Sequence, residues 1–412
     1  MLTSLIRQNT FIININFSVN PLHVAVLCSY FNFKAGGLER HVYYLIQGLT
    51  NYGIKVSLIT SYKDPYTNVI IPPYRSNKLN VIPLKYILSP FNNPLMPRLS
   101  KILTEIDPDI IHVHDHYFYG SMFSSILRKF IKRPLVLTVH TSKLRYDNSL
   151  KNLIVDVYDA VIGNAVLKVV DKIIVLTRTT MYELIKRGVP LDKIVYIPNF
   201  LTIGSIEDYD MNIYNSIKES GKLKILYVGR LVPRKGPHIL LNAFNIALKN
   251  VFIPKDSILM IVGKGPLEEH LRIIASTSSE LKEKVIFWGA VSDKVLGAIY
   301  KAADVVVLPS LSGEVAPFVI QEAIFFEKPF VASLVGGILD YVMDHFWGFY
   351  VPPKDMIILA RTLGSVYKLL TKNPNFVLEK VRENKRKLLC THSKEHIIFK
   401  TIITYVDAAK FI

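Results

Sequence analysis

Short, mainly apolar runs alternate with amphipathic helical patterns along the whole chain of 412 residues. Each run is apolar at both alternations, which is typical of parallel strands whose two faces are covered by helices. The runs are residues 23–28, 55–60, 109–114, 135–140, 172–177, 223–228, 257–262 and 304–308. After the first run, Leu38, Val42, Leu45, Ile46 and Leu49 recur at helical spacing and predict one buried stripe. The pattern predicts an α/β fold built from strand–helix–strand units.

The periodicity lapses between residues 201 and 221, where Gly, Ser, Asn and acidic residues gather. This lapse predicts two domains, residues 1–205 and 223–395, joined by a linker over 206–222. Because ligands of parallel sheets bind beyond the carboxyl ends of the strands, we expect the two domains to enclose a deep cleft. Residues 1–20 lack the apolar core of a signal peptide. We interpret them either as an extra strand or as the product of a mis-assigned start codon.

Charge and cysteine content exclude several classes of protein. The net charge is +17, and residues 1–205 alone hold 23 Lys and Arg against 12 Asp and Glu. Such an excess favours an anionic ligand or an acidic membrane surface, although a solvated basic surface explains it equally well. No RNA-binding motif, zinc finger or long basic run points to nucleic acid. Apolar runs of about 18 residues, which a membrane span needs, do not occur. Two cysteines far apart in sequence predict neither disulfides nor a thiolate zinc site, and fit a cytoplasmic protein.

Two loops that follow predicted strands are suited to phosphate groups. Gly36 and Gly37 precede the first helix, where the backbone can approach a ligand and the helix offers free N–H groups to an anion. A tight turn that binds no ligand would also require these glycines. The second loop holds Gly229, Arg230 and Lys235. Fixed positive charges there can neutralise a diphosphate and stabilise it as a leaving group, unless both are simply solvated.

Two further loops complete the set. A Gly-Lys-Gly sequence starting at Gly263 follows the next strand and is a weak signal alone. Glu314 and Glu322 flank Pro317 in an otherwise apolar segment. If a helix begins at Pro317-Phe318, Glu314 lies in the preceding loop and Glu322 about one turn inside the helix. Both carboxylates can then accept hydrogen bonds from the hydroxyls of one sugar-like ligand.

In this order, the four loops resemble those of the GT-B glycosyltransferases, specifically the retaining family 4 group, from about residue 22 to the end. Further matches are Thr138-Val-His140, Ile197-Pro198-Asn199, residues 261–269, Phe287-Trp-Gly289 and Val335-Gly-Gly337. The resemblance implies two Rossmann-like doubly wound domains that face each other across a deep cleft. It also implies a nucleotide-diphosphate-sugar donor on the C-terminal domain, an acceptor on the N-terminal domain, and a last helix, residues 396–412, that crosses back to the N-terminal domain. No metal and no cofactor are implied.

The resemblance also assigns roles by position. Arg230 and Lys235 match the diphosphate clamp, Glu322 the ligand of the ribose hydroxyls, and Glu314 the carboxylate beside the donor sugar. His140 matches the residue near the reacting centre. The remaining expected donor-site positions are Gly36, Gly37, Gly229, Gly263, Phe318 and Val319, and those on the acceptor side are His114, His116 and Asn199.

Departures from the family pattern concern the donor. Val319 follows Phe318 where the family usually has glycine, which leaves the identity of the donor sugar open. Asp340 stands where a glutamate is common. The bulky Phe325-Phe326 replaces a small stretch, which we interpret as a change in core packing.

The alternating histidines His112, His114 and His116 at a strand end allow three interpretations. They can chelate a metal, contact the acceptor, or cap the end of the strand. No second set of histidines or carboxylates elsewhere in the sequence completes a metal shell, so we expect no metal site.

The expected activity is the transfer of a sugar from a nucleotide-diphosphate sugar to an acceptor hydroxyl, on the same face as the departing group. The alternatives are a nucleotide-sugar epimerase, a phosphorylase, which would want a longer chain, and a non-catalytic nucleotide-sugar-binding protein. The basic N-terminal domain and the aromatic residues 117–119 suit docking on an anionic membrane that holds a lipid-linked acceptor, and a soluble sugar acceptor is the open alternative. The expected location is cytoplasmic, either free or peripheral on the inner face of the membrane.

Overall fold

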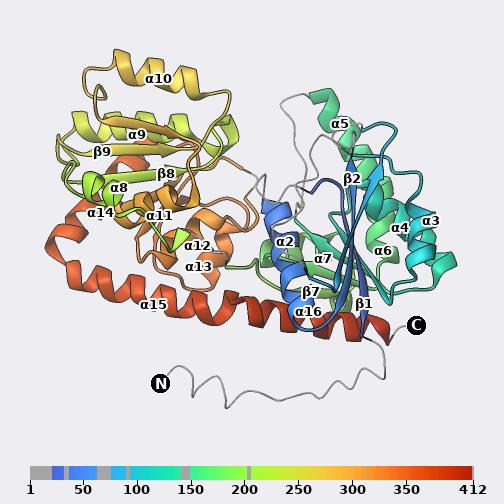
Figure 1. The fold of residues 1–412 in the computed structure, drawn as a ribbon. Helices are drawn as coiled ribbons and strands as arrows, with labels where there is room; N and C mark the ends of the chain where they lie inside the picture. Colours follow the sequence, from blue (N-terminus) through green and yellow to red (C-terminus); the bar gives the residue numbers. More distant parts are fainter. Residues whose placement is uncertain are drawn as a thin grey trace, which may run out of the picture.

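The fold was analysed in a computed structural model (Figure 1). The structure describes residues 21–31, 37–62, 76–89, 93–140, 149–201, 206–312 and 314–410. The expectations for residues 1–20 and for Gly36 therefore lie outside the described residues.

The N-terminal domain is built on a seven-stranded parallel sheet with the order β3-β2-β1-β4-β5-β6-β7. Its strands are β1 His23–Cys28, β2 Lys55–Tyr62, β3 Leu79–Lys85, β4 Ile110–His114, β5 Leu135–Val139, β6 Lys172–Val175 and β7 Ile194–Tyr196. The helices between them are α2 Gly37–Asn51, α3 Leu99–Ile106, α4 Tyr119–Ile131, α5 Ser149–Tyr158, α6 Asn164–Val169 and α7 Arg178–Lys186, with a π-helix, η2 Asp159–Gly163, between α5 and α6.

The C-terminal domain is built on a six-stranded parallel sheet with the order β10-β9-β8-β11-β12-β13. Its strands are β8 Lys224–Val228, β9 Ile258–Val262, β10 Val285–Gly289, β11 Val305–Leu308, β12 Phe330–Ser333 and β13 Phe349–Val351. The helices are α8 Met211–Lys218, α9 Pro237–Lys249, α10 Glu268–Thr277, α11 Asp293–Ala302, α12 Phe318–Phe325, α13 Ile338–Met343, α14 Met356–Lys372, α15 Pro374–His392 and α16 Lys394–Ala409.

Both sheets are covered on both faces, as the apolar runs predict. Along β1, Val24 and Val26 belong to the core under α2, whereas Ala25 and Leu27 belong to the core on the opposite face. The strand order reverses once in each sheet, between β1 and β4 and between β8 and β11. In doubly wound sheets, ligands bind in the crevice at this reversal, outside the carboxyl ends of the strands. The expected pair of doubly wound α/β domains is confirmed, and the reversals indicate where to look for the site.

The segment expected to link the domains contains a helix. Asp210 caps α8 by accepting hydrogen bonds from the backbone of Asn212 and Ile213. The helix belongs to the C-terminal domain, because Ile217 packs in the same core as Ile299 of α11.

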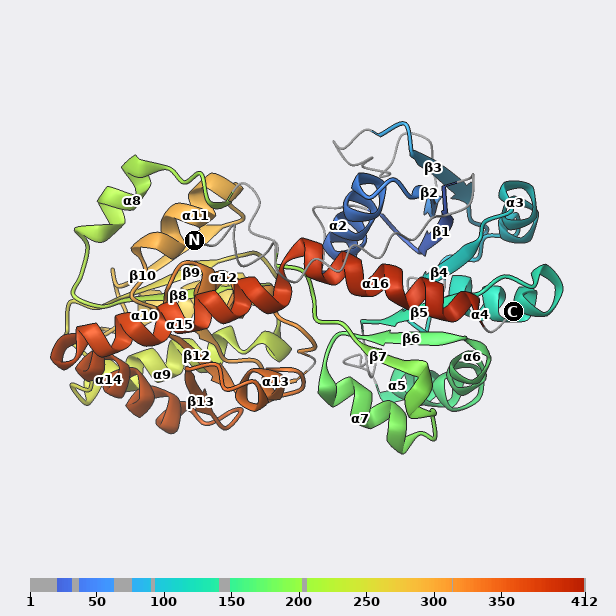
Figure 2. The same ribbon diagram turned by 90° about the horizontal axis from the view of Figure 1, so that it is seen from below.

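The last two helices run beneath both domains, as Figures 1 and 2 show. α15 packs on the C-terminal domain through Leu388. The chain then turns at Ser393, and α16 packs Ile398 and Tyr405 into the N-terminal core. A Cβ at Gly48 of α2 would lie 2.3 Å from the side chain of Ile398, so this glycine lets the two helices approach closely. Among the described residues, no helix combines the length and the apolar character that crossing a membrane requires.

Candidate functional site

Two glycines shape the loops at the carboxyl ends of β8, β9 and β11. Gly263 has φ 130°, and a Cβ there would lie 1.9 Å from the carbonyl oxygen of Gly229. Gly236 has φ 69°, and a Cβ there would lie 2.0 Å from the carbonyl oxygen of Pro309. Only glycine fits these left-handed, tightly packed positions. The loops after the three strands are therefore locked against one another, and they hold the exposed Arg230 and the partly buried Lys235 in place.

A nearly buried ion pair lies at the reversal between β8 and β11. The Lys235 ammonium donates to the Glu314 carboxylate, and the Ser310 hydroxyl donates to the same oxygen at 2.5 Å. The side chains are 18% and 4% exposed. Burial lowers the pKa of Lys235, the Glu314 charge opposes that shift, and Arg234 and Arg230 add to the lowering. The lysine is thus a desolvated cation whose charge is balanced by Glu314.

Glu322 lies inside α12, the helix that begins directly after Pro317. It is buried, and its Oε2 accepts a hydrogen bond from the Tyr300 hydroxyl at 2.7 Å. Its other oxygen lies 3.6 Å from Arg40 Nη1, which comes from the N-terminal domain. Phe318 and Val319 are the first two residues of α12, so their N–H groups belong to the unpaired first turn of the helix.

The N-terminus of α2 faces this region from the other domain. A Cβ at Gly37 would lie 3.4 Å from the ring of Phe318, and the Arg40 guanidinium lies over that ring at 4.7 Å. Burial raises the pKa of Glu39, and the charge of Arg230 opposes that shift. Two helix N-termini, those of α2 and α12, and several cations therefore converge on one region, which favours a negatively charged ligand.

A second contact between the domains is made by Asp340 of α13. Its carboxylate accepts hydrogen bonds from the backbone N–H of Arg178 at 2.6 Å and from the Thr179 hydroxyl at 3.1 Å. It thereby accepts a hydrogen bond from the unpaired N–H at the start of α7 in the opposite domain. A small cavity beside it is lined by Asn199 from one domain and Gln321 from the other.

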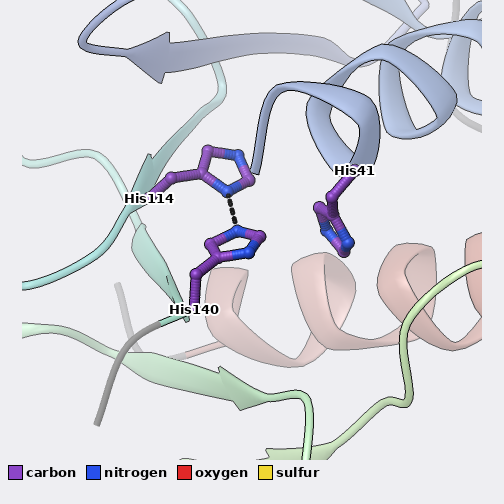
Figure 3. Close-up of side chains that lie close together, drawn as sticks. All are labelled: His41, His114 and His140. Atoms are coloured by element: carbon purple, nitrogen blue, oxygen red, sulfur yellow. Dashed lines mark hydrogen bonds between the residues drawn. The ribbon is translucent and has the colours of Figure 1, made fainter. Parts of the chain in front are cut away.

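Three histidines cluster at the carboxyl ends of the N-terminal strands (Figure 3). His114 Nδ1 and His140 Nε2 are 3.0 Å apart, and the ring of His41 lies 4.8 Å from that of His140. His41 Nδ1 contacts Asn199 Oδ1 at 2.9 Å. Because an amide oxygen only accepts, His41 donates from Nδ1 and keeps a lone pair on Nε2.

Burial keeps all three rings neutral. It lowers the pKa of His41 to about 4 and the pKa values of His114 and His140 well below the ordinary range. The cluster therefore offers lone pairs and N–H donors rather than positive charge. His114 Nε2 is buried and has no hydrogen-bond partner within the described structure.

The alternating histidines of β4 separate into three environments. Both ring nitrogens of His112 are engaged, with the Tyr405 hydroxyl and the Thr138 hydroxyl, each at 2.7 Å, so this residue ties α16 to the sheet. His116 binds Asp159 at 3.1 Å, away from the cluster, and only His114 joins the cluster.

The structure brings two further histidines to His114, which the sequence did not indicate, whereas the expected absence of a metal stays a prediction. His41 and His140 each place a possible ligand atom within 4.8 Å of one on His114. The sequence separates these three residues widely, and only the fold brings them together.

Comparisons with known proteins identify the family. The family model described as "Glycosyltransferase Family 4" matches residues 35–203, and that described as "Glycosyl transferases group 1" matches residues 212–388. The chain belongs to the GT-B glycosyltransferases of family 4. It is therefore a glycosyltransferase of the hexosyltransferase type.

The relatives of this family-4 enzyme are distant but cover most of it. The phosphatidyl-myo-inositol mannosyltransferase of Mycobacterium leprae is 28% identical over 84% of this chain and 88% of the relative. HepE of Anabaena in complex with UDP has a TM-score of 0.72 at 18% identity, covering 93% of this chain and 99% of that one. Sucrose-phosphate synthase of Thermosynechococcus elongatus also has a TM-score of 0.72, at 21% identity, covering 95% and 100%. The two structures support the GT-B fold.

Two residues of this glycosyltransferase site have no role assigned from the sequence. His41 ends the Gly-Gly-x-x-x-His pattern, and Arg40 precedes it. The pattern was the available signal for His41. For Arg40, no local feature indicates a contact with Glu322, 282 positions later, because the contact arises only when the two domains face each other.

Proposed function

We propose that this glycosyltransferase moves a hexosyl group, with retention of configuration, from a nucleoside-diphosphate sugar to an acceptor hydroxyl. The observation that carries the proposal is the buried Lys235–Glu314 pair beside Glu322, directly opposite the N-terminus of α2. A cation and two carboxylates in one crevice suit a ligand with both phosphates and sugar hydroxyls.

The cations act on the leaving group. Arg230 and Lys235, with the N-termini of α2 and α12, face the diphosphate, whose negative charge grows as the bond to the sugar breaks. Interactions that strengthen in this way accelerate the reaction, because they stabilise the transition state more than the bound substrate. Glu322 binds the ribose hydroxyls through the carboxylate oxygen that lies near Arg40, once these hydroxyls have displaced the arginine.

The remaining roles are shared between residues of the two domains. Glu314 orients the donor sugar through its hydroxyls. The acceptor oxygen bonds to the anomeric carbon on the face from which the diphosphate departs, and its proton passes to a departing phosphate oxygen. Neutral His140, held by His114, lies on the N-terminal side of this reaction and hydrogen-bonds the donor sugar or the acceptor without adding charge.

A metal is not needed in this scheme, because cationic side chains and helix N-termini supply the positive charge. The donor set of His41, His114 and His140 would nonetheless suit a divalent transition metal, since neutral imidazoles are its usual ligands. Chelation therefore tests this part of the proposal directly.

The acceptor is proposed to be lipid-linked. Phosphatidyl-myo-inositol mannosyltransferases are among the relatives, and the net charge of +11 on residues 1–205 suits an anionic membrane that would hold such an acceptor. A soluble sugar acceptor is the second candidate, and sucrose-phosphate synthase among the structural neighbours supports it.

The test begins with a thermal-shift panel of UDP, GDP, ADP and their common sugars. We expect one nucleotide series to raise the melting temperature. The product formed with that donor is then examined by NMR for the configuration at the anomeric carbon. An inverted product would refute retention, and no stabilisation by any nucleotide would refute the proposed donor class.

A further inference from the structure

The helix α5 turns an apolar stripe toward solvent. Leu150, Leu153, Ile154 and Val157 of α5, with Val161 of the following η2, are between 45% and 66% exposed. The spacing of three, four and seven residues from Leu150 places the four α5 side chains on one face of the helix. A surface helix normally turns such a stripe toward the core, so the orientation of α5 is the reverse of the usual one.

The inward side of α5 is held by few apolar contacts. Val155 is the one buried residue among those described in this helix, and the Tyr158 hydroxyl contacts the sulfur of Met122 at 3.9 Å. A contiguous exposed apolar surface of this kind is uncommon in proteins that have no partner for it.

The stripe is followed by η2, which contacts His116, one of the residues expected on the acceptor side. In η2, which follows α5, Asp159 accepts hydrogen bonds from His116 at 3.1 Å, from the Tyr117 hydroxyl at 3.1 Å and from Arg187 at 2.9 Å. His116 follows β4 by two residues, and β4 ends with His114 of the histidine cluster. Figure 1 shows α5 at the opposite end of the N-terminal domain from α16.

We infer that this stripe docks the enzyme on an anionic lipid bilayer, with α5 lying in the interface beside the site. The inference rests on the proposed function, in which the acceptor hydroxyl belongs to a lipid-linked molecule. A helix whose apolar face enters the headgroup region binds through that face and through the attraction of basic residues to anionic lipid. Residues 1–205 supply this attraction with 23 Lys and Arg against 12 Asp and Glu.

The chemistry of the stripe favours lipid over a protein partner. Its five side chains are all aliphatic, whereas the cores of protein interfaces are enriched in aromatic residues, Met and Arg. The cavity beside α5 is lined by Asp156 and Asp159 and by none of the five stripe residues, so the stripe offers no pocket for an anchoring side chain, and a fluid hydrocarbon surface requires none.

Co-sedimentation with vesicles tests the inference at physiological salt. The full chain is mixed with vesicles of phosphatidylcholine alone or with added phosphatidylglycerol. A double variant, Leu153→Gln with Val157→Gln, is compared with the control Ile273→Gln with Ile357→Gln. The control residues are 54% and 56% exposed and lie on α10 and α14 of the C-terminal domain. We expect the anionic vesicles to bind the wild type. The partition coefficient of the stripe variant should be lower by about 10-fold or more, whereas that of the control should match the wild type.

Three results would overturn the inference. They are a wild type that stays in the supernatant, a stripe variant that sediments as well as the wild type, and a wild-type dimer in size-exclusion chromatography that the stripe variant abolishes. The last would assign the stripe to self-association. Thermal shifts with nucleoside diphosphates, measured on the same samples, separate this outcome from failure of the proposed function. They must be unchanged in the stripe variant if the fold is intact, and they are absent altogether if the donor proposal is wrong.

Discussion

The Lys235–Glu314 pair gives a quantitative prediction for stability. In Glu314→Gln, the amide keeps the shape of the carboxylate and can still accept from Ser310, but the charge that compensates the Lys235 ammonium is lost. With the two side chains only 18% and 4% exposed, water cannot replace that charge. Removing one partner of a buried pair costs about 3–5 kcal/mol, and partial exposure of the lysine places this pair near the lower end.

The assay is a double-mutant cycle by urea unfolding with Glu314→Gln, Lys235→Met and the combination. A loss of about 3 kcal/mol corresponds to a fall in melting temperature of about 6–12 °C for a domain of this size. We expect the combined variant to recover part of the loss, because it leaves no buried charge unpaired. Glu268→Gln, which breaks a surface pair with Arg272, serves as the control and should cost less than about 1 kcal/mol. Single variants that each lose less than 1 kcal/mol and add without coupling would refute the reasoning.

Three further predictions concern the pH dependence of stability, the contact between Arg40 and Glu322, and the removal of metal. Burial lowers the pKa of His41 and of His392 to about 4, so the unfolded chain binds protons before the folded one does. The contribution of these two histidines to the free energy of unfolding should therefore be complete above about pH 6.5, and the free energy should fall by several kcal/mol as the pH drops toward 4. Urea titrations that give the same free energy at pH 7 and pH 4.5 would contradict this. Arg40→Gln should change the affinity for nucleoside diphosphate measured by calorimetry, because it removes the cation that lies 3.6 Å from Glu322; unchanged binding would argue that this contact does not involve the donor site. EDTA treatment should leave transfer activity unchanged, whereas a loss that Zn²⁺ restores would assign a metal to the histidine cluster.

The central strands of both sheets were predictable because they are buried on both faces. β1, β4, β8 and β9 read as continuous apolar runs for this reason. The strands missed in the sequence lie at or next to the sheet edges, where burial is partial or the strand is short. β3 mixes exposed and half-buried residues, and β13 has only three residues. Neither leaves a pattern that distinguishes a strand from a loop.

Sequence analysis placed Glu314 and Glu322 correctly relative to the start of α12, because Pro317 marks a helix start. It could not place Arg40 against Glu322, nor His41 against His140. The first contact depends on how the two domains face each other, and the second on how helix α2 packs against the end of β5. For the same reason, the exposed stripe of α5 was not predicted, since its apolar spacing is the same as that of a helix facing the core.

The most direct test of the account is a calorimetric titration of the nucleoside diphosphate selected by the thermal-shift panel into the wild type, Arg230→Ala and Glu322→Gln. A charge-assisted hydrogen bond contributes about 1.5–3 kcal/mol. The account therefore predicts binding about 10-fold to 100-fold weaker in each variant, at unchanged stoichiometry. Wild-type affinity in both variants would contradict the claim that the carboxyl ends of β8 and β11 hold the donor.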